Sequence, residues 1–134
     1  MPLVAIFAAP HPPLIMVRRL LTCRARSRRY CAPEVLDGGR YACSCDVYSF
    51  GICLLEIAAI CVGARRDFVK KQIRSHVFIA NGGRPRMPHT LEKQAPNICS
   101  VIRMCWHGDP ASRPNFRELL EVIEGWAGEL APTS

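Results

Sequence analysis

Eight cysteines are the residues of this chain best suited to bind a metal ion or to form disulfides. They stand at positions 23, 31, 43, 45, 53, 61, 99 and 105. Structural zinc sites use cysteines or histidines paired at short, fixed spacings, such as two cysteines separated by two residues. No pair here has that spacing, and Cys43 and Cys45 have no second pair downstream. The pattern disfavours zinc and a disulfide scaffold, and predicts reduced thiols in a cytoplasmic protein.

Six arginines near the N-terminus could neutralise phosphate groups. They are Arg18, Arg19, Arg24, Arg26, Arg28 and Arg29, and residues 1–33 contain no acidic residue. Nearly all of the formal net charge of +7 therefore lies in this segment. Proteins that bind single-stranded nucleic acid add a series of aromatic residues for stacking, whereas the arginine run is accompanied only by Tyr30. We expect a solvated or partner-facing basic segment, with nucleic-acid binding the less favoured alternative.

The elements that position these residues must belong to one domain, because the chain has 134 residues. Its composition, 49% hydrophobic and 22% charged, excludes a disordered chain. Residues 1–26 are expected to form an irregular arm, since Pro10, Pro12 and Pro13 end a short apolar stretch. An Arg-rich, acid-free mitochondrial presequence is an open alternative for this arm. Residues 47–64 are long enough to span a membrane, but Glu56 near their middle favours a buried core helix and no membrane.

About four main helices are predicted, and no segment alternates as a strand does, so the expected fold class is all-α. The first helix runs over 46–61 with Asp46 as its cap. The second covers 66–80, after which 84–90 is expected to be an extended loop. The apolar positions of the second helix are Val69, Ile73, Val77 and Ala80.

The third predicted helix begins with Asn97 as its cap and ends near Gly108. Its apolar residues match one helical face fully; they are Ile98, Val101, Ile102, Cys105 and Trp106. The last helix has Pro114 near its first turn, where a missing N–H costs nothing. Its core face is formed by Phe116, Leu119, Leu120 and Ile123, with Trp126 as a further anchor.

Four segments stand in a diagnostic order: YCAPEVL at 30–36, DVYSFGICLLE at 46–56, RPRMP at 84–88 and CWHGDPASRPNF at 105–116. Together they resemble the C-terminal lobe of a eukaryotic protein kinase domain of the tyrosine-kinase and tyrosine-kinase-like type. The first resembles the A-P-E segment that closes the activation loop, and the second the start of the long central helix. The resemblance covers 27–126, a partial kinase domain, and leaves 127–134 as a tail.

The resemblance implies a role for each matching residue. Glu34, which follows Ala32 and Pro33, would pair with Arg113, and a buried carboxylate needs such a bidentate partner. Asp46 would accept hydrogen bonds from the backbone of the catalytic loop. Trp106 is expected in the core. The acceptor-side loop would contain Ser27, Tyr30 and Cys31, although Arg26 and Ser27 replace the family's usual Gly-Thr.

Phosphoryl transfer needs a lysine on the phosphates, an aspartate to orient the acceptor hydroxyl, and an aspartate and an asparagine to hold magnesium. The family places all of these before the A-P-E segment, yet no Asp, Glu, Lys or Asn precedes Glu34. The sequence also lacks H-R-D, D-F-G and G-x-G-x-x-G. We therefore expect a truncated, pseudokinase-like domain with no catalytic, cofactor or metal residues of its own, whereas the intact family uses ATP and magnesium.

Two functions are compatible with this reading. The chain is a protein kinase by resemblance, directed at Ser/Thr or Tyr side chains of proteins but inactive alone. The alternative is a non-catalytic remnant that binds a protein substrate or a partner kinase. The C-W-x-x-D-P element is shared by tyrosine kinases and serine/threonine kinases, so it does not decide the acceptor residue.

Overall fold

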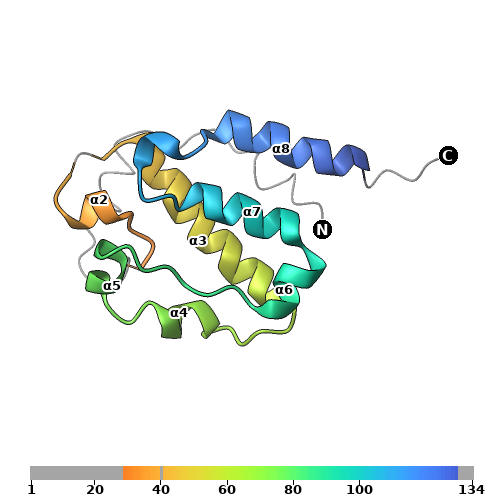
Figure 1. Ribbon diagram of the computed structural model, residues 1–134, viewed down its shortest axis with the longest axis horizontal. Coiled ribbons are helices and arrows are strands. Elements are labelled where there is room, and N and C mark those ends of the chain that lie inside the picture. The colour runs from red at the N-terminus through yellow and green to blue at the C-terminus, as the bar shows by residue number, and fades with distance from the viewer. Residues whose placement is uncertain (1–28, 40, 130–134) are drawn as a thin grey trace.

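A computed structural model describes residues 29–39 and 41–129, and these fold into helices without a strand (Figure 1). The all-α prediction is thereby confirmed, although the described part contains seven α-helices where four were expected. They are α2 (Pro33–Leu36), α3 (Cys43–Cys61), α4 (Phe68–Gln72), α5 (His76–Ala80), α6 (His89–Gln94), α7 (Pro96–Cys105) and α8 (Phe116–Glu129), with a 3₁₀ turn η2 (Pro110–Ser112). The extra helices are short, so the three long ones, α3, α7 and α8, organise the fold.

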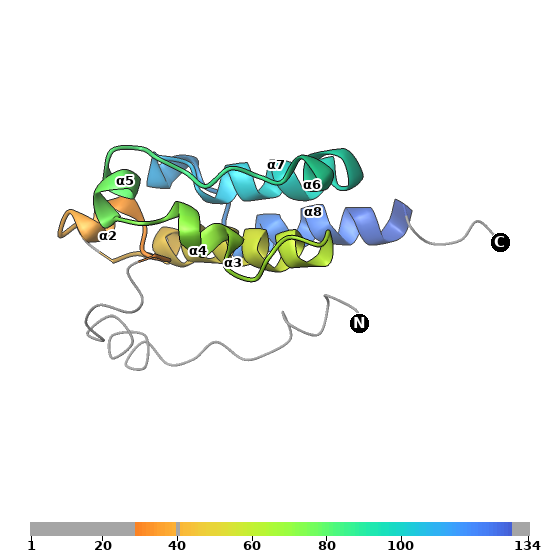
Figure 2. The same cartoon turned by 90° about the horizontal axis from the view of Figure 1, so that it is seen from below.

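The central element is α3, which packs along α7. Figure 2 shows α6 and α7 in one layer and α3 and α4 in another. The two helices approach closely at Gly51, whose missing side chain leaves room for Cys105. The largest fully buried side chains come mainly from these two helices; they include Tyr48, Ile52 and Leu55 of α3 and Val101, Ile102 and Cys105 of α7.

The predicted start of α3 was wrong. The helix begins at Cys43 with Ala42 as its N-cap residue, and Asp46 lies in its first turn, making no cap hydrogen bond. The added turn buries Cys45, which is 2% exposed, a contribution that the apolar pattern from Val47 onward does not reveal. At its other end α3 stops as predicted near Cys61, where Gly63 takes a φ of 90°, a backbone conformation that glycine adopts without strain.

The predicted helix over 66–80 is divided into α4 and α5. Ser75 starts the second of these, because its hydroxyl accepts a hydrogen bond from the Val77 N–H at 3.1 Å. The new helix has a different phase, so Val77 is 52% exposed and Ile79 is buried in its place. Sequence spacing correctly assigned Val69 and Ile73 to the core but could not show that the periodicity breaks after them.

Three other helix boundaries differ from prediction. The extended segment after Gly83 ends at Pro88, because α6 begins at His89 within the predicted loop. Helix α7 starts at Pro96, and Asn97 is not its cap. Helix α8 starts at Phe116 and not at Pro114, since Asn115 and Glu118 cap it reciprocally: each backbone N–H donates to the other side chain, at 3.1 and 2.8 Å.

The apolar faces of the last two helices pack largely as predicted. Val101, Ile102, Cys105 and Trp106 are buried, and Ile98 packs against the core. In α8, Leu119 is buried while Phe116 and Trp126 are partly buried against the core. The Phe116 ring meets Phe50 of α3 edge-on, with 5.8 Å between ring centroids. Leu120 is 36% exposed, so its assignment to the core face was wrong.

Within the described ranges, one helix is long and apolar enough to cross a membrane by length and composition, namely α3. Half of that stretch is buried inside the fold, as expected of a core helix in a globular domain. In the same ranges no three His, Cys, Asp or Glu side chains gather in a way that could hold a metal ion.

Candidate functional site

The site that joins the kinase-like motifs is an ion pair between Glu34 in the first turn of α2 and Arg113 after η2. Two parallel hydrogen bonds connect them: Nη1 to Oε1 at 2.6 Å and Nη2 to Oε2 at 3.0 Å. The Arg113 side chain has no exposed surface and that of Glu34 is 22% exposed. The geometry is the bidentate pairing of guanidinium and carboxylate, and it joins two segments 79 residues apart in the sequence.

Backbone carbonyl groups hold the Arg113 guanidinium in place. Its Nε donates to the His107 carbonyl at 2.9 Å and its Nη1 to the Ser44 carbonyl at 3.0 Å. Asp109 shapes the preceding turn, since its carboxylate accepts from the Ala111 N–H and caps η2. The buried charge is thus surrounded by acceptors from α3, from the loop after α7 and from α2, as a buried cation requires.

An aromatic ring that the sequence did not single out lies at the centre of this arrangement. The ring centroid of Tyr48 is 5.1 Å from the guanidinium carbon of Arg113 and 5.1 Å from that of Arg84, distances typical of cation–π contact. Arg84 is itself fixed by donating to the carbonyls of Trp106 at 2.9 Å and Gly83 at 2.7 Å. The available signal was that Tyr48 and Arg84 both stand within the kinase-like segments.

The charge state of Glu34 follows from these contacts. Burial alone would raise its pKa, but the hydrogen bonds and charge of Arg113 outweigh burial and hold the pKa below its ordinary value of 4.5. The Cys45 thiol adds a hydrogen bond to Oε1 at 3.4 Å. The pKa of the Cys45 thiol is raised, mainly by burial and next by the hydrogen bond to the Glu34 carboxylate.

We expect the ion pair of Glu34 and Arg113 to make the free energy of unfolding depend on pH. A carboxyl group whose pKa is lower in the folded state contributes stability above its unfolded pKa and loses it as pH falls through the folded value. Chemical denaturation of the wild-type protein should therefore show a falling free energy of unfolding below about pH 4.5. The Glu34→Gln variant should fall less steeply over the same range. Parallel curves for the two proteins would contradict the pairing.

The segment before α2, which the sequence predicts to be part of an acceptor-side loop, is fixed onto α3 by Tyr30. Its hydroxyl donates to Glu56 Oε2 at 2.8 Å, and its carbonyl accepts from the Ser49 hydroxyl at 2.6 Å. Burial, followed by the hydrogen bond to Glu56, raises the pKa of Tyr30 to about 12. This hydroxyl therefore stays protonated and serves as a donor that positions the loop.

The remaining predicted residues lie in the core, at or just before the start of α2, in α3, or outside the described residues. Ala32 is 1% exposed and Trp106 is 9% exposed, so both belong to the core, while Pro33 opens α2 and Cys31 is half-buried. The Asp46 carboxylate accepts a hydrogen bond from the Tyr41 hydroxyl, and its role toward a catalytic loop stays a prediction. Ser27 and the arm of residues 1–26 lie outside the described residues.

The thiols differ in accessibility. Cys45, Cys99 and Cys105 are at most 2% exposed, and burial raises the pKa of Cys105 to about 12, whereas Cys43 and Cys61 are exposed. Because the thiolate is the reactive form, we expect iodoacetamide at pH 8 to modify Cys43 and Cys61 quickly and the buried three only on unfolding. Peptide mass spectrometry of a labelling time course checks this. Equal rates for both groups would contradict the packing.

Comparison with known proteins agrees with this geometry. The family of protein tyrosine and serine/threonine kinases matches residues 20–123. That match covers the A-P-E segment, the central helix and the Arg113 segment, which the structure brings together. The chain belongs to the protein kinase family.

The chain is also similar to individual kinases. A probable serine/threonine-protein kinase, gdt4, of Dictyostelium discoideum is 36% identical over 105 residues, or 78% of this chain and 6% of that protein. Serine/threonine-protein kinase 12 of Arabidopsis thaliana is 32% identical over 104 residues, covering 77% of this chain and 22% of the plant protein. Human mitogen-activated protein kinase kinase kinase 7 is 32% identical over 108 residues, which cover 77% of this chain and 16% of the human protein. The chain thus spans less than a quarter of each of these relatives.

Proposed function

We propose that this chain supplies the acceptor-side helical lobe of a protein kinase, and that by itself it transfers no phosphate. The observation that carries the first half is the buried pair of Glu34 and Arg113, which fixes the end of the acceptor-side loop to the helical body. The family match to residues 20–123 supports the same assignment.

The second half of the proposal rests on chemistry that the sequence does not contain. Kinases stabilise the transferred phosphoryl group with a lysine, two magnesium ligands and a catalytic aspartate on dedicated motifs. This sequence has no H-R-D, no D-F-G and no glycine-rich loop, and its first lysine is Lys70, after the central helix. Among the charged groups of the described site, Arg113 is buried and paired, so it is not free to bind a nucleotide.

Phosphotransfer from labelled ATP to mixed protein acceptors, with magnesium present, tests the proposal. The purified chain should give no transfer above a heat-denatured control, and ATP with magnesium should not raise its melting temperature. As a positive control, a kinase domain from the tyrosine-kinase-like group should label the same acceptors. Turnover by this chain that survives repurification would contradict the proposal.

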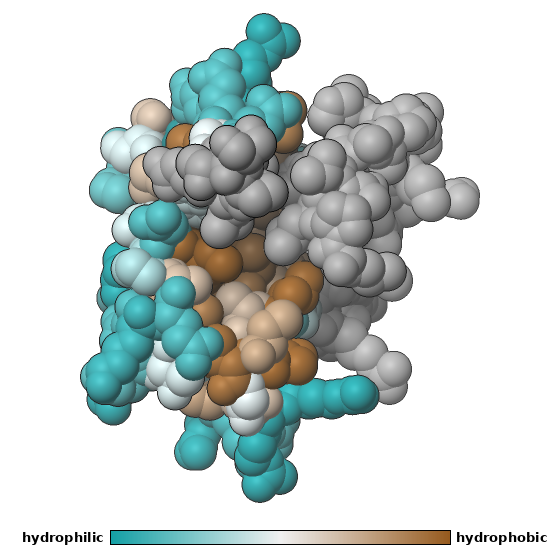
Figure 3. Space-filling model, turned by 90° about the vertical axis from the view of Figure 1, so that its right-hand side faces the viewer, coloured by the Kyte–Doolittle hydropathy of each residue, from teal (hydrophilic) through white to brown (hydrophobic). Residues whose placement is uncertain are grey.

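A second candidate, a protein-binding module, is favoured by apolar side chains left on the surface. On α3, Ile57 is 53% exposed and Ile60 is 44% exposed. Figure 3 shows apolar side chains gathered at the end of the molecule that includes α6 in Figure 1. Contiguous apolar surface of this kind marks a binding face or a liability to associate.

Sedimentation with a purified kinase domain of the tyrosine-kinase-like group tests this second candidate. A binding module should form a saturable, stoichiometric complex that is weakened by Ile57→Ser and Ile60→Ser. Concentration-dependent association of this chain with itself alone would argue that the apolar face is only a liability.

A further inference from the structure

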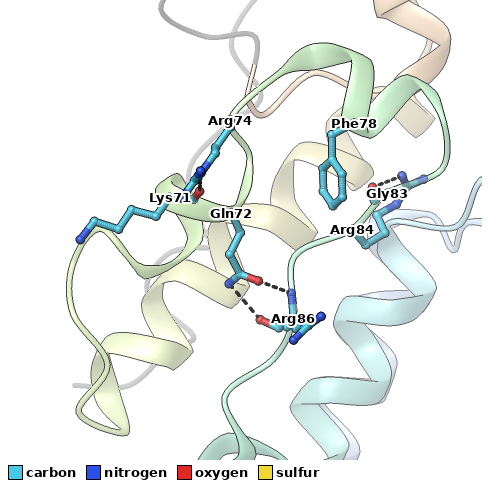
Figure 4. A pocket seen from close by; sticks show the side chains of 7 residues that line it. All are labelled: Lys71, Gln72, Arg74, Phe78, Gly83, Arg84 and Arg86. Atoms are coloured by element: carbon cyan, nitrogen blue, oxygen red, sulfur yellow. Dashed lines mark hydrogen bonds between the residues drawn. The ribbon is translucent and has the colours of Figure 1, made fainter.

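A cationic pocket adjoins the arrangement around Tyr48, with which it shares Arg84, but Glu34 and Arg113 do not line it. It has a volume of about 570 Å³ and opens between α4, α5 and the extended segment after Gly83. Figure 4 shows the Phe78 ring between Arg74 and Arg84, with Arg86 below it. The lining residues are Lys71, Gln72, Arg74, Phe78, Gly83, Arg84 and Arg86.

The lining carries positive charge and no carboxylate. Lys71 is not available to bind a ligand in the pocket. Its ammonium pairs with Asp67 at 2.8 Å, and its side chain points away from the pocket in Figure 4. Within the ranges that the structure describes, no acidic side chain forms an ion pair with Arg74, Arg84 or Arg86. Arg84 adds charge but few free donors, because its guanidinium lies over the Tyr48 ring and donates to the carbonyls of Trp106, Gly83 and Ile79. Arg74 and Arg86 are exposed at the pocket, and their two guanidinium groups create a local positive field that attracts an anion.

The pocket is held in shape by hydrogen bonds. The side chain of Gln72 accepts from the Arg86 N–H at 2.7 Å and donates to the Arg86 carbonyl at 3.3 Å, which fixes the extended segment against α4. Arg74 Nε donates to the Lys71 carbonyl at 3.2 Å. Arg84 is held by the carbonyls of Trp106 and Gly83. The backbone that carries Arg86 and the Nε of Arg74 are therefore held in place before a ligand binds, which lowers the cost of ordering the site.

We propose that this pocket binds the phosphoryl group of a phosphorylated peptide segment. Guanidinium groups match phosphate oxygens with paired donors, so a cluster of arginines favours phosphate over a single carboxylate. Phe78, 40% exposed, offers an apolar contact for the residue beside the phosphorylated one. The pocket is open to solvent, so a phosphorylated side chain could enter it while the peptide backbone that carries it stays outside. The proposal does not depend on the function proposed above.

The chemistry of the pocket favours a peptide over two other anionic macromolecules. Single-stranded nucleic acid is held by successive aromatic platforms along a basic groove, whereas this pocket contains one aromatic ring. Binding to an anionic membrane uses a broad basic surface with apolar residues that insert, whereas these arginines line one concave site.

Fluorescence anisotropy with the full chain tests the proposal. The probe is a short labelled peptide with one phosphoserine next to a leucine, and its unphosphorylated twin is the reference. The variant Arg74→Ala/Arg86→Ala should bind the phosphopeptide at least about tenfold more weakly, since it loses two charge-assisted contacts. The matched control Lys93→Ala/Arg117→Ala removes the same charge from exposed positions on α6 and α8 and should stay within about twofold.

Other outcomes would overturn the proposal. Equal binding of the two peptides, or equal losses in the two double variants, would mean that the basic segment before Tyr30 or net charge binds the probe. Inorganic phosphate, a single-stranded oligonucleotide or phosphatidylserine vesicles binding more tightly than the peptide, and only with the pocket intact, would assign another ligand. If the double variant loses its helical circular dichroism, Arg86→Glu replaces it, because Gln72 holds Arg86 through backbone atoms that remain.

Discussion

Replacing Arg113 with alanine is expected to lower the free energy of unfolding by about 3–5 kcal/mol. The guanidinium is fully buried and satisfies the Glu34 carboxylate and the carbonyls of Ser44 and His107. Its removal leaves a largely buried carboxylate without its partner, which costs more than the pair contributes when intact. Urea denaturation followed by circular dichroism measures the change.

A matched control separates this effect from the loss of any arginine. Arg103 pairs with Glu92 at 2.9 Å, but both side chains are about half exposed, so Arg103→Ala should cost less than about 1 kcal/mol. Arg113→Lys should fall between the two, because an ammonium keeps the charge but not the parallel pair of hydrogen bonds. A cost below about 1 kcal/mol for Arg113→Ala would mean that the pair is open to water in solution.

Replacing Gly51 with alanine is expected to destabilise the fold by about 1–3 kcal/mol. A Cβ at this position would stand 2.6 Å from Cβ of Cys105, so α3 and α7 would have to move apart. Helix propensity acts in the opposite direction, since alanine is favoured over glycine inside a helix by up to about 1 kcal/mol. Thermal unfolding by circular dichroism should give a lower melting temperature.

Gly125 in α8 supplies the matched control. It is also a glycine inside a helix, but among the described residues no atom outside the adjacent backbone of α8 lies within 4 Å of the Cβ that alanine would add. Gly125→Ala should therefore stabilise by about 0.5–1 kcal/mol through helix propensity alone. The two substitutions are chemically identical, so stabilisation by both would show that close packing of α3 on α7 does not govern position 51.

The sequence was sufficient for features that depend on residue order and periodicity. The face of α7 from Ile98 to Trp106 repeats at helical spacing over two turns, and it packs as the repeat predicts. The pairing of Glu34 with Arg113 could not come from spacing across 79 residues, and it was predicted only because both residues stand in kinase-like motifs. The bidentate geometry confirms that pairing.

The rest depended on interactions that a single sequence does not display. The break between α4 and α5 follows from the Ser75 hydroxyl competing for the Val77 N–H, a local choice that continuous apolar spacing conceals. The contact of Tyr48 with two guanidinium groups requires α3, the Arg84 segment and the Arg113 turn to meet. The apolar run around Tyr48 gives no sign of such a contact, and the one available signal was that Tyr48 and Arg84 stand within kinase-like segments.

A double-mutant cycle on Glu34 and Arg113 tests the central claim most directly, namely that this pair joins the A-P-E segment to the helical body. The variants are Glu34→Ala, Arg113→Ala and the two combined, each measured by urea denaturation at pH 7. We predict that the double variant is less destabilised than the sum of the single variants, by about 1–3 kcal/mol of coupling. Additivity within about 0.5 kcal/mol would show that the two residues act independently and would contradict the account.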